Sequence, residues 1–255
     1  MNLTKLLPDW FCYSPIIQPY LPENTRVYCI GDIHGCDHLL LLLWEKIEAD
    51  IGNFKGKILL IYLGDFIDRG QNSKQIIDQL LINQRENIKA IYLRGNHEQT
   101  LLECLQNPLM IPNWIAFGGL ATLNSYGVYL DHIATTIEDF TELQQQFKQK
   151  LPRDHYEFFI QTRLSYTIGS YFFVHAGIYP KRNLSDQYPD DLLWIRETFT
   201  RSKRNYGKII VHGHTISDKP ELLPNRIGID TGAYMSGILT CLVLEDCYQR
   251  ILQTQ

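Results

Sequence analysis

Residues 92–99, YLRGNHEQ, place an arginine, an asparagine, a histidine and a glutamate around one glycine. They overlap the end of the apolar run 88–93, which is typical of a buried strand. Polar groups gathered at a strand end could hold a metal ion, grip an anion and transfer a proton. They could also form only a turn closed by Asn96, with a helix beginning at Glu98. The rest of the chain must decide between these interpretations.

Four other glycine-flanked polar clusters follow short apolar runs of the kind that form strands. They are GDIHG after RVYCI, GDFIDRG after KILLIYL, HAG after YFFV, and HGHT after KIIV. Two further runs, RIGI before DTGA and ILTCLVLE near the end, are also candidate strands. Open α/β sheets place their sites at the carboxyl ends of strands, where such loops meet. We therefore expect the polar groups of all five clusters to converge.

Six residues in these clusters offer oxygen or nitrogen ligands, and no cysteine is among them. They are Asp32, His34, Asp65, Asn96, His175 and His214. Carboxylate, imidazole and amide groups suit divalent ions such as Mn, Fe or Zn, and six ligands exceed what one tetrahedral zinc site uses. Two ions are the economical interpretation. With Asp65 as a shared ligand they would lie about 3.5–4 Å apart.

Each element also has a purely structural interpretation. A lone D-x-H after a strand is commonly a turn with a helix cap, and His212, inside its apolar run, suggests a buried structural histidine. Asp230 in IDTGA could form an Asx-turn. The basic stretch 196–208 is typical of a solvated face, apart from Arg196, which follows Trp194. Five such clusters in order, each at a strand end, favour a shared site over chance.

The elements around these clusters predict an α/β fold. The 255 residues are 45% hydrophobic, enough for one sizeable core. Helices are expected at 38–49, 73–84 and 98–105, so the front half reads βαβαβα and favours a largely parallel sheet. Residues 100–168 form a predicted helical insertion. Within it one amphipathic helix ending at Pro152 is indicated by apolar residues at helical spacing: Ile137, Phe140, Leu143, Phe147 and Leu151.

Composition and simple sequence patterns indicate the domain limits, the cellular compartment and the kinds of binding partner to expect. Residues 1–25, broken by four prolines, are expected to be an irregular arm on a single domain spanning 26–255. No signal peptide pattern is present, and the longest unbroken apolar run, 39–44, is far below the roughly 20 residues that span a bilayer. Six cysteines without a C-x-x-C pair fit reduced thiols in a cytoplasmic protein. A net charge of −4 gives no reason to expect nucleic acid as partner.

The clusters GDIHG, GDFIDRG, RGNHE, HAG and GHT resemble, in this order, the signature of the phosphoprotein phosphatase (PPP) family of metallophosphoesterases. The match runs from about residue 27 to residue 243. The forms GDIHGC, GNHEQ and IDTGA resemble the bacterial and phage serine/threonine phosphatases more than the eukaryotic catalytic subunits. The tyrosine-bearing loop near the C-terminus of the eukaryotic enzymes is not recognisable.

The resemblance implies a four-layer α/β/β/α calcineurin-like catalytic domain with a dinuclear metal centre. One ion would be held by Asp32, His34 and the bridging Asp65. The other would be held by Asp65, Asn96, His175 and His214. His214 is preferred to His212 because it occupies the histidine position of G-H-T.

Hydrolysis of a phosphate monoester needs an activated water, cations for the phosphate and a proton donor for the leaving alkoxide. Two metal ions lower the pKa of a shared water, so a hydroxide can attack phosphorus directly. His97 is the expected general acid, with Asp68 orienting its imidazole. Glu98 is expected to support the start of its helix or the residues around the site. The expected phosphate ligands are forked cationic donors: Arg69, Arg94 and Arg196.

The predicted activity is hydrolysis of phosphoserine and phosphothreonine in phosphorylated proteins or peptides, with two divalent ions. Mn is the expected metal, and Fe and Zn are alternatives. A hydrolase of dinucleoside polyphosphates such as diadenosine tetraphosphate is the first alternative activity, and a small-molecule phosphatase the second. Asp68 beside Arg69 favours the protein phosphatase branch, because the nucleotide branch generally lacks that acidic residue. An inactive phospho-binding module is disfavoured, since every proposed position is filled.

Overall fold

A computed structural model describes residues 17–83, 87–129 and 131–255. Three parallel strands run through its first sheet, β1 (Thr25–Ile30), β2 (Lys57–Tyr62) and β3 (Ile88–Tyr92). Helices α1 (Asp37–Ile51) and α2 (Ser73–Ile82) connect them, and α3 (Asn96–Gln106) follows. The βαβαβα pattern predicted for the front half is confirmed, with helix ends shifted by one or two residues. Gln84, the expected last residue of the second helix, lies outside the described residues.

Two antiparallel strands complete the first sheet on the side of β1. They are β9 (Thr240–Glu245) and β10 (Tyr248–Gln253), and the strand order is β10-β9-β1-β2-β3. The apolar run of β9 was predicted. The edge strand β10 was not, because its sequence YQRILQ is polar and only partly buried.

The second sheet contains the later strands in the order β4-β5-β6-β8-β7. Its parallel centre is β5 (Tyr171–Val174), β6 (Ile209–His212) and β8 (Arg226–Gly228). All three were predicted from the runs YFFV, KIIV and RIGI. The antiparallel edges β4 (Ser165–Ile168) and β7 (Glu221–Leu222) were not, since both are short and largely unburied. Both sheets are mixed, and each contains parallel strands that were expected from the sequence.

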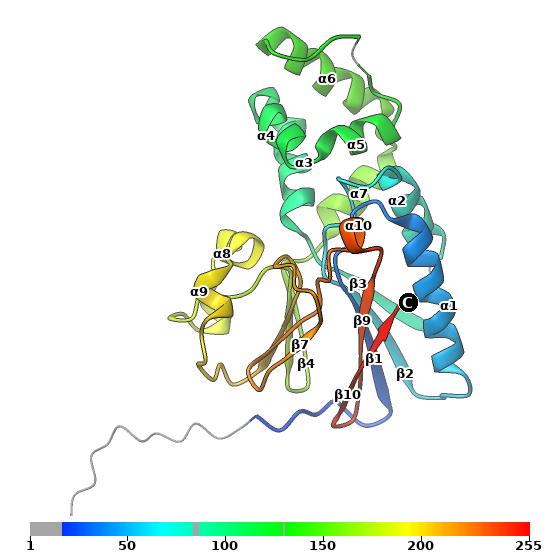
Figure 1. The fold of residues 1–255 in the computed structure, drawn as a ribbon, viewed down its shortest axis with the longest axis vertical. Coiled ribbons are helices and arrows are strands. Elements are labelled where there is room, and N and C mark those ends of the chain that lie inside the picture. Colours follow the sequence, from blue (N-terminus) through cyan, green and yellow to red (C-terminus); the bar gives the residue numbers. More distant parts are fainter. Residues whose placement is uncertain (1–16, 84–86, 130) are drawn as a thin grey trace, which may run out of the picture.

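Alternate side chains of the strands separate the layers, as the two-residue period of a strand requires. Val27 and Cys29 of β1 pack toward the second sheet, against Phe173 and Val211 among others. Tyr28 of β1 packs with α1 in the outer core. Figure 1 shows the sheets facing each other, with α1 on one outer side and α8 and α9 on the other. The four-layer α/β/β/α fold is therefore confirmed.

The chain between β3 and β4 forms a group of helices that stands above the sheets in Figure 1. After α3 come α4 (Ile111–Ala116), α5 (Gly119–Ser125), α6 (Ile137–Lys150) and α7 (Arg153–Gln161), with a 3₁₀ turn at Pro108–Met110. The amphipathic helix predicted before Pro152 is α6. Its N-cap is Thr136, whose hydroxyl accepts a hydrogen bond from the Asp139 amide. Strand β4 falls inside the range 100–168 expected for the insertion.

The chain after β5 contains several short helices: α8 (Pro189–Trp194), α9 (Glu197–Thr200), α10 (Ala233–Ser236) and a 3₁₀ turn at Leu184–Asp186. Within the described ranges no helix combines the length and the apolar character needed to cross a bilayer. Most of the predicted N-terminal arm, residues 1–16, lies outside the described residues. Its remainder joins the two sheets, because the Tyr20 carbonyl accepts a bond from Ser170 and the Leu21 amide donates to Asp246.

Candidate functional site

The five polar clusters meet where the carboxyl ends of both sheets come together. Loops after β1, β2 and β3 approach from the first sheet, and loops after β5 and β6 approach from the second. All six predicted metal ligands are buried there: Asp32, His34, Asp65, Asn96, His175 and His214. The convergence expected from the strand ends is what the structure shows.

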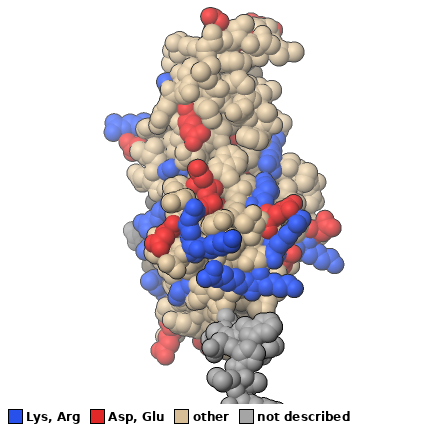
Figure 2. Space-filling view, turned by 90° about the vertical axis from the view of Figure 1, so that its left-hand side faces the viewer, with Lys and Arg blue, Asp and Glu red and all other residues tan. Residues whose placement is uncertain are grey.

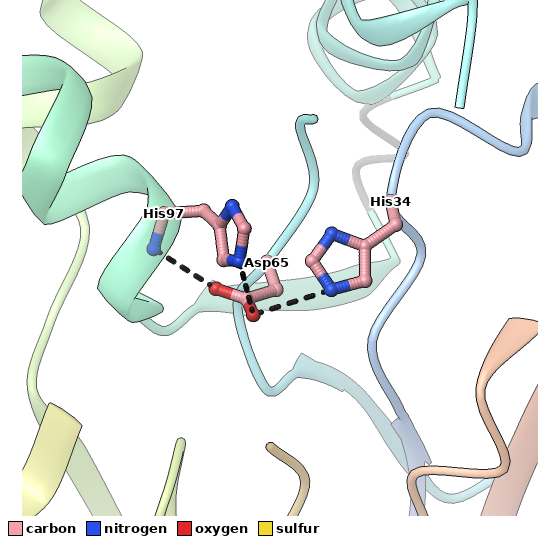
Figure 3. Close-up of side chains that lie close together, drawn as sticks. All are labelled: His34, Asp65 and His97. Atoms are coloured by element: carbon pink, nitrogen blue, oxygen red, sulfur yellow. Dashed lines mark hydrogen bonds and ion pairs between the residues drawn. The ribbon is translucent and has the colours of Figure 1, made fainter. Parts of the chain in front are cut away.

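Asp65 lies at the centre of this cluster. Its Oδ2 atom is 3.4 Å from His34 Nε2, and its Oδ1 atom is 3.5 Å from His175 Nε2. Oδ1 also accepts a hydrogen bond from the His97 backbone amide at 3.2 Å. Figure 3 shows His34 and His97 on either side of this carboxylate. Asp65 is thus the side chain that touches both halves of the cluster.

Hydrogen bonds from His34 and His175 to backbone carbonyls determine which ring nitrogen of each faces Asp65. His34 Nδ1 lies 2.8 Å from the Ile67 carbonyl, and His175 Nδ1 lies 2.9 Å from the Leu63 carbonyl, so each Nδ1 carries the proton and donates it. Both Nε2 atoms therefore turn lone pairs toward the Asp65 oxygens. Metal-ligating histidines commonly donate their other N–H to a carbonyl in this way.

The other half of the cluster contains two atoms without hydrogen-bond partners. His175 Nε2 lies 2.9 Å from Asn96 Oδ1 and 3.2 Å from His214 Nδ1. Asp32 Oδ2 accepts the His214 amide at 2.9 Å. Asp32 Oδ1 and His214 Nε2 are buried and unpartnered among the described residues. Leaving such atoms bare costs free energy, so they are candidates for binding an ion.

The electrostatics also favour cations. Burial, and then the nearby Asp230 and Asp65 carboxylates, raise the pKa of Asp32 well above its usual range. Burial alone would raise the pKa of Asp65, but the imidazoles of His175 and His97 hold it below its usual value. Burial first, and the Asp65 charge with it, raise the pKa of Asp230 to about 6. Three carboxylates crowd one buried space.

The residues present therefore fit divalent metal ions. Two groups each bring ligand atoms within 4.8 Å of one another, namely His34, Asp65 and His97, and Asp65, His175 and His214. Asp65 belongs to both. Lone pairs aimed at carboxylate oxygens, together with unpartnered ligand atoms, are the arrangement that a cation between them would satisfy.

The backbone holds these side chains in unusual conformations. Among the described residues, seven that are not glycine have positive φ, and five of them belong to the site: His34, Asp65, Asp68, Arg69 and His214. Such residues cost free energy and cluster at functional sites. Two glycines are needed for space, because a Cβ on Gly95 would lie 2.0 Å from Asp65 Oδ1, and one on Gly213 would lie 2.0 Å from Asp32 Oδ1.

His97 is hydrogen-bonded to Asp68, the residue that we expected to orient its imidazole ring. Its Nδ1 lies 2.6 Å from Asp68 Oδ2, while Nε2 lies 3.8 Å from Asp65 Oδ2. Burial would lower the pKa of His97, but the charges of Asp65 and Asp68 raise it overall. The sequence did not reveal what holds Asp68. Trp114 Nε1 donates to its carboxylate at 2.9 Å, and the Thr122 hydroxyl at 2.5 Å.

Glu98 supports the loop that carries Asp65. Its carboxylate accepts hydrogen bonds from the backbone amides of Asp65 at 2.8 Å, Phe66 at 2.8 Å and Gly95 at 2.9 Å. Burial is the main reason that its pKa is raised to about 7. The supporting position expected for Glu98 is what these contacts describe.

Two of the three predicted phosphate ligands lie at the site, and Arg94 does not join them. Arg69 Nη2 lies 3.3 Å from His97 Nε2, and Arg196 Nη1 donates to the His214 carbonyl at 2.8 Å. The Arg94 guanidinium turns to the end of α7, where it bonds the Thr162 hydroxyl at 2.9 Å and three backbone carbonyls. Carbonyls at a helix end lack intrahelical donors, which explains this orientation.

Three residues around the cluster were given no site role in the sequence. Asp230 forms the expected Asx-turn with the Gly232 amide at 2.9 Å, but it also faces Asp32. Phe117 and Trp194, 44% and 38% exposed, contact each other with ring centroids 5.9 Å apart and ring planes tilted by 49°. Phe117 lies 6.3 Å from the His97 ring, and Trp194 lies 6.4 Å from the His214 ring. These rings border the mouth of the site.

His212 is separate from this site. Its Nε2 contacts Arg226 Nη1 at 3.2 Å, and its ring packs on Phe199 at 5.1 Å. Burial lowers its pKa to about 4, so it is a neutral core residue. These contacts agree with the structural role expected for a histidine inside a strand.

Comparison with known proteins gives the same type of fold. The family model described as calcineurin-like phosphoesterase matches residues 25–218. An asymmetrical bis(5′-nucleosyl)-tetraphosphatase of Anoxybacillus flavithermus is 28% identical over 236 residues, covering 84% of this chain and 88% of that protein. Serine/threonine-protein phosphatase 2 of Salmonella typhimurium is 29% identical over 230 residues, covering 84% and 91%.

Among solved structures, a cold-active protein tyrosine phosphatase superposes with a TM-score of 0.59 at 16% identity. The match covers 91% of this chain and 81% of that one. At this identity the likeness concerns the fold alone.

Proposed function

The chain belongs to the calcineurin-like phosphoesterase family, and from this premise we propose that it hydrolyses phosphoserine and phosphothreonine in proteins. The observation that carries the proposal is the buried His97–Asp68 pair, 2.6 Å apart beside Asp65. Serine and threonine leave as strongly basic alkoxides, so their departure depends on a proton donor. The terminal nucleotide of a dinucleoside polyphosphate leaves as a phosphate, which is much less basic.

The proposed metal ligands are the six buried residues around Asp65. Asp32, His34 and Asp65 would hold one ion, and Asp65, Asn96, His175 and His214 the other. When bound, divalent ions supply Lewis-acid activation of water and neutralise phosphate charge. Mn is the proposed metal, because mixed carboxylate, imidazole and amide ligands suit it.

The protein's own side chains bind the phosphate and deliver the proton. Arg69 lies beside His97 and Arg196 beside His214, and both offer forked N–H donors to the phosphate oxygens. Arg69 is braced by the Tyr234 ring, 4.6 Å from its guanidinium carbon. Asp68 keeps His97 Nδ1 protonated and aims Nε2 at the cluster. His97 in its protonated form can then donate from Nε2 to the leaving oxygen.

Hydrolysis of dinucleoside tetraphosphates is the second candidate activity. It is favoured by the similarity to the bis(5′-nucleosyl)-tetraphosphatase over 84% of this chain. The exposed Phe117–Trp194 pair could stack on a base.

A side-by-side measurement of kcat/KM with Mn distinguishes the two activities. We expect phosphoserine and phosphothreonine peptides to be hydrolysed with a higher kcat/KM than diadenosine tetraphosphate. A clear preference for the dinucleotide would overturn the protein phosphatase assignment and leave the phosphoesterase chemistry in place.

A further inference from the structure

The side of the molecule that carries α8 and α9 gathers cations next to the site. Residues 181–208 contain seven Lys or Arg and four Asp or Glu, although the whole chain has a net charge of −4. Figure 2 shows Lys and Arg side chains concentrated on this face at the level of these helices. Apart from Arg196, which is proposed to bind the phosphate, we call its exposed cations the α9 face: Lys181, Arg201, Lys203 and Arg204.

Several of these cations have no strong ion-pair partner within the protein that would compete with a ligand. The side chains of Lys181 and Lys203 have no partner among the described residues. Arg201 pairs with Glu197, but the two side chains are 78% and 73% exposed, so this ion pair competes weakly with a ligand. Arg182 differs, because it is tied to Asp191 and lies 3.6 Å over the Tyr188 ring.

The α9 face is joined to the site through Arg196. This residue donates to the His214 carbonyl at 2.8 Å and precedes the four-residue helix α9, and Arg201 follows that helix. Arg204 Nη1 donates to the Pro180 carbonyl at 2.8 Å, and the Asn225 amide bonds the Ser202 and Arg204 carbonyls. The exposed cations of residues 196–204 are therefore tied to the segment that carries His214 and to neighbouring loops.

The exposed apolar side chains near the site favour a polypeptide over an inorganic polyanion as the ligand of the α9 face. Phe117 and Trp194 present exposed rings at the mouth, and Ile216 is also 38% exposed. A polyphosphate chain gains nothing from apolar contacts, whereas a peptide can use both kinds. We infer that the α9 face binds acidic side chains that flank the phosphorylated residue of a protein substrate. This inference rests on the proposed protein phosphatase function.

Two phosphoserine peptides test the inference, one with aspartates and one with asparagines in the flanking positions. The measured quantity is the ratio of their kcat/KM values, which isolates the flank because one site cleaves both. We expect wild type to prefer the acidic peptide about tenfold at about 50 mM salt, falling to about twofold at about 500 mM.

Charge reversal on the α9 face should remove the preference. In the double variant Lys203→Glu/Arg204→Glu the ratio should fall to about one or below. The matched control is Lys55→Glu/Lys57→Glu, which makes the same charge change at the amino end of β2, opposite the site. The control should keep the wild-type ratio. A wild-type ratio that persists in the α9 variant, or an equal fall in the control, would overturn the inference.

Two further outcomes are decisive in other ways. If the α9 variant lost hydrolysis of polyphosphate but kept its preference among peptides, the face would serve an inorganic polyanion and the inference would be wrong. If wild type cleaved neither peptide but hydrolysed an aryl phosphate, the protein phosphatase function itself would fail, and the inference with it. Preserved circular dichroism and melting temperature of each variant would show that altered ratios do not come from misfolding.

Discussion

Two histidine–carboxylate clusters in this protein have similar composition, but one is fully buried and lacks some hydrogen-bond partners, whereas the other is partly exposed and fully partnered. The first is the cluster around Asp65 at the strand ends. The second joins α2, α5 and α7, where His155 contacts the Tyr126 hydroxyl through Nδ1 at 2.8 Å and Asp78 Oδ1 through Nε2 at 3.0 Å. Lys74 donates to the other Asp78 oxygen at 2.8 Å.

The clusters differ in whether every polar atom has a hydrogen-bond partner. In the second cluster both nitrogens of His155 and both oxygens of Asp78 have partners. We call this group of His155, Tyr126, Asp78 and Lys74 the closed cluster. Around Asp65, by contrast, lone pairs face carboxylate oxygens, and Asp32 Oδ1 and His214 Nε2 have no partner. Completed networks stabilise a fold, whereas incomplete ones in a buried space mark a place where something binds.

Removing the shared carboxylate should have the largest effect. Asp65→Asn takes one anionic ligand from both proposed ion sites, and we expect kcat/KM to fall about 10,000-fold, as loss of several kcal/mol of transition-state stabilisation implies. His155→Phe, at the closed cluster, should keep activity within about twofold. Comparable activity in Asp65→Asn and wild type, measured with added Mn, would rule out Asp65 as the bridging ligand.

Replacing the proton donor should have the next largest effect. His97→Asn should lower kcat about 100- to 1,000-fold on a phosphoserine peptide, and much less on an aryl phosphate, because the aryl oxide leaves without full protonation. Metal content should be retained. Equal losses on both substrates, with metals intact, would mean that His97 does not donate the proton.

Stability, unlike activity, should depend on the closed cluster at His155. His155→Phe leaves the buried Tyr126 hydroxyl and the Asp78 carboxylate without their shared partner, and we expect a loss of about 1–3 kcal/mol in the free energy of unfolding. Urea denaturation would measure it, with His38→Gln as control, since the His38 side chain is 69% exposed. A loss no greater than in the control would show that the closed cluster contributes little.

The pH dependence of that loss should be the smallest effect. Burial lowers the pKa of His155 from 6.5, despite the charges of Asp78 and Asp154, while Lys74 lowers it further. A depressed histidine pKa means that the unfolded chain binds the proton first, so the stabilisation is present above about pH 6.5 and is lost as pH falls. The stability difference between wild type and His155→Phe should therefore be smaller at about pH 5.5 than at about pH 7.5. A difference that grows on acidification would contradict this sign.

The sequence predicts this fold and much of the site because their signals are local. Each glycine-flanked cluster directly follows an apolar run, and parallel strands bring their carboxyl ends together. Asp65 and His175 could thus be assigned to one site from short motifs, although 110 positions separate them. The edge strands β7 and β10 lacked such a signal, because they are short or polar and depend on pairing with a neighbour.

Long-range partners could not be predicted in this way. The orientation of Arg94 depends on carbonyls at the end of α7, some 65 positions later in the chain. Trp114 and Thr122 approach Asp68 only because the helices after β3 fold back over the site. The closed cluster at His155 likewise joins three helices whose spacing in sequence carries no motif.

The metal content of the protein tests the central claim most directly. Wild type, Asp65→Asn and His155→Phe would each be equilibrated with Mn, desalted and analysed by inductively coupled plasma mass spectrometry. The account predicts about two ions per chain in wild type and in His155→Phe, and fewer than about one in Asp65→Asn. Two retained ions in Asp65→Asn, or no bound ion in wild type, would contradict a dinuclear centre built around Asp65.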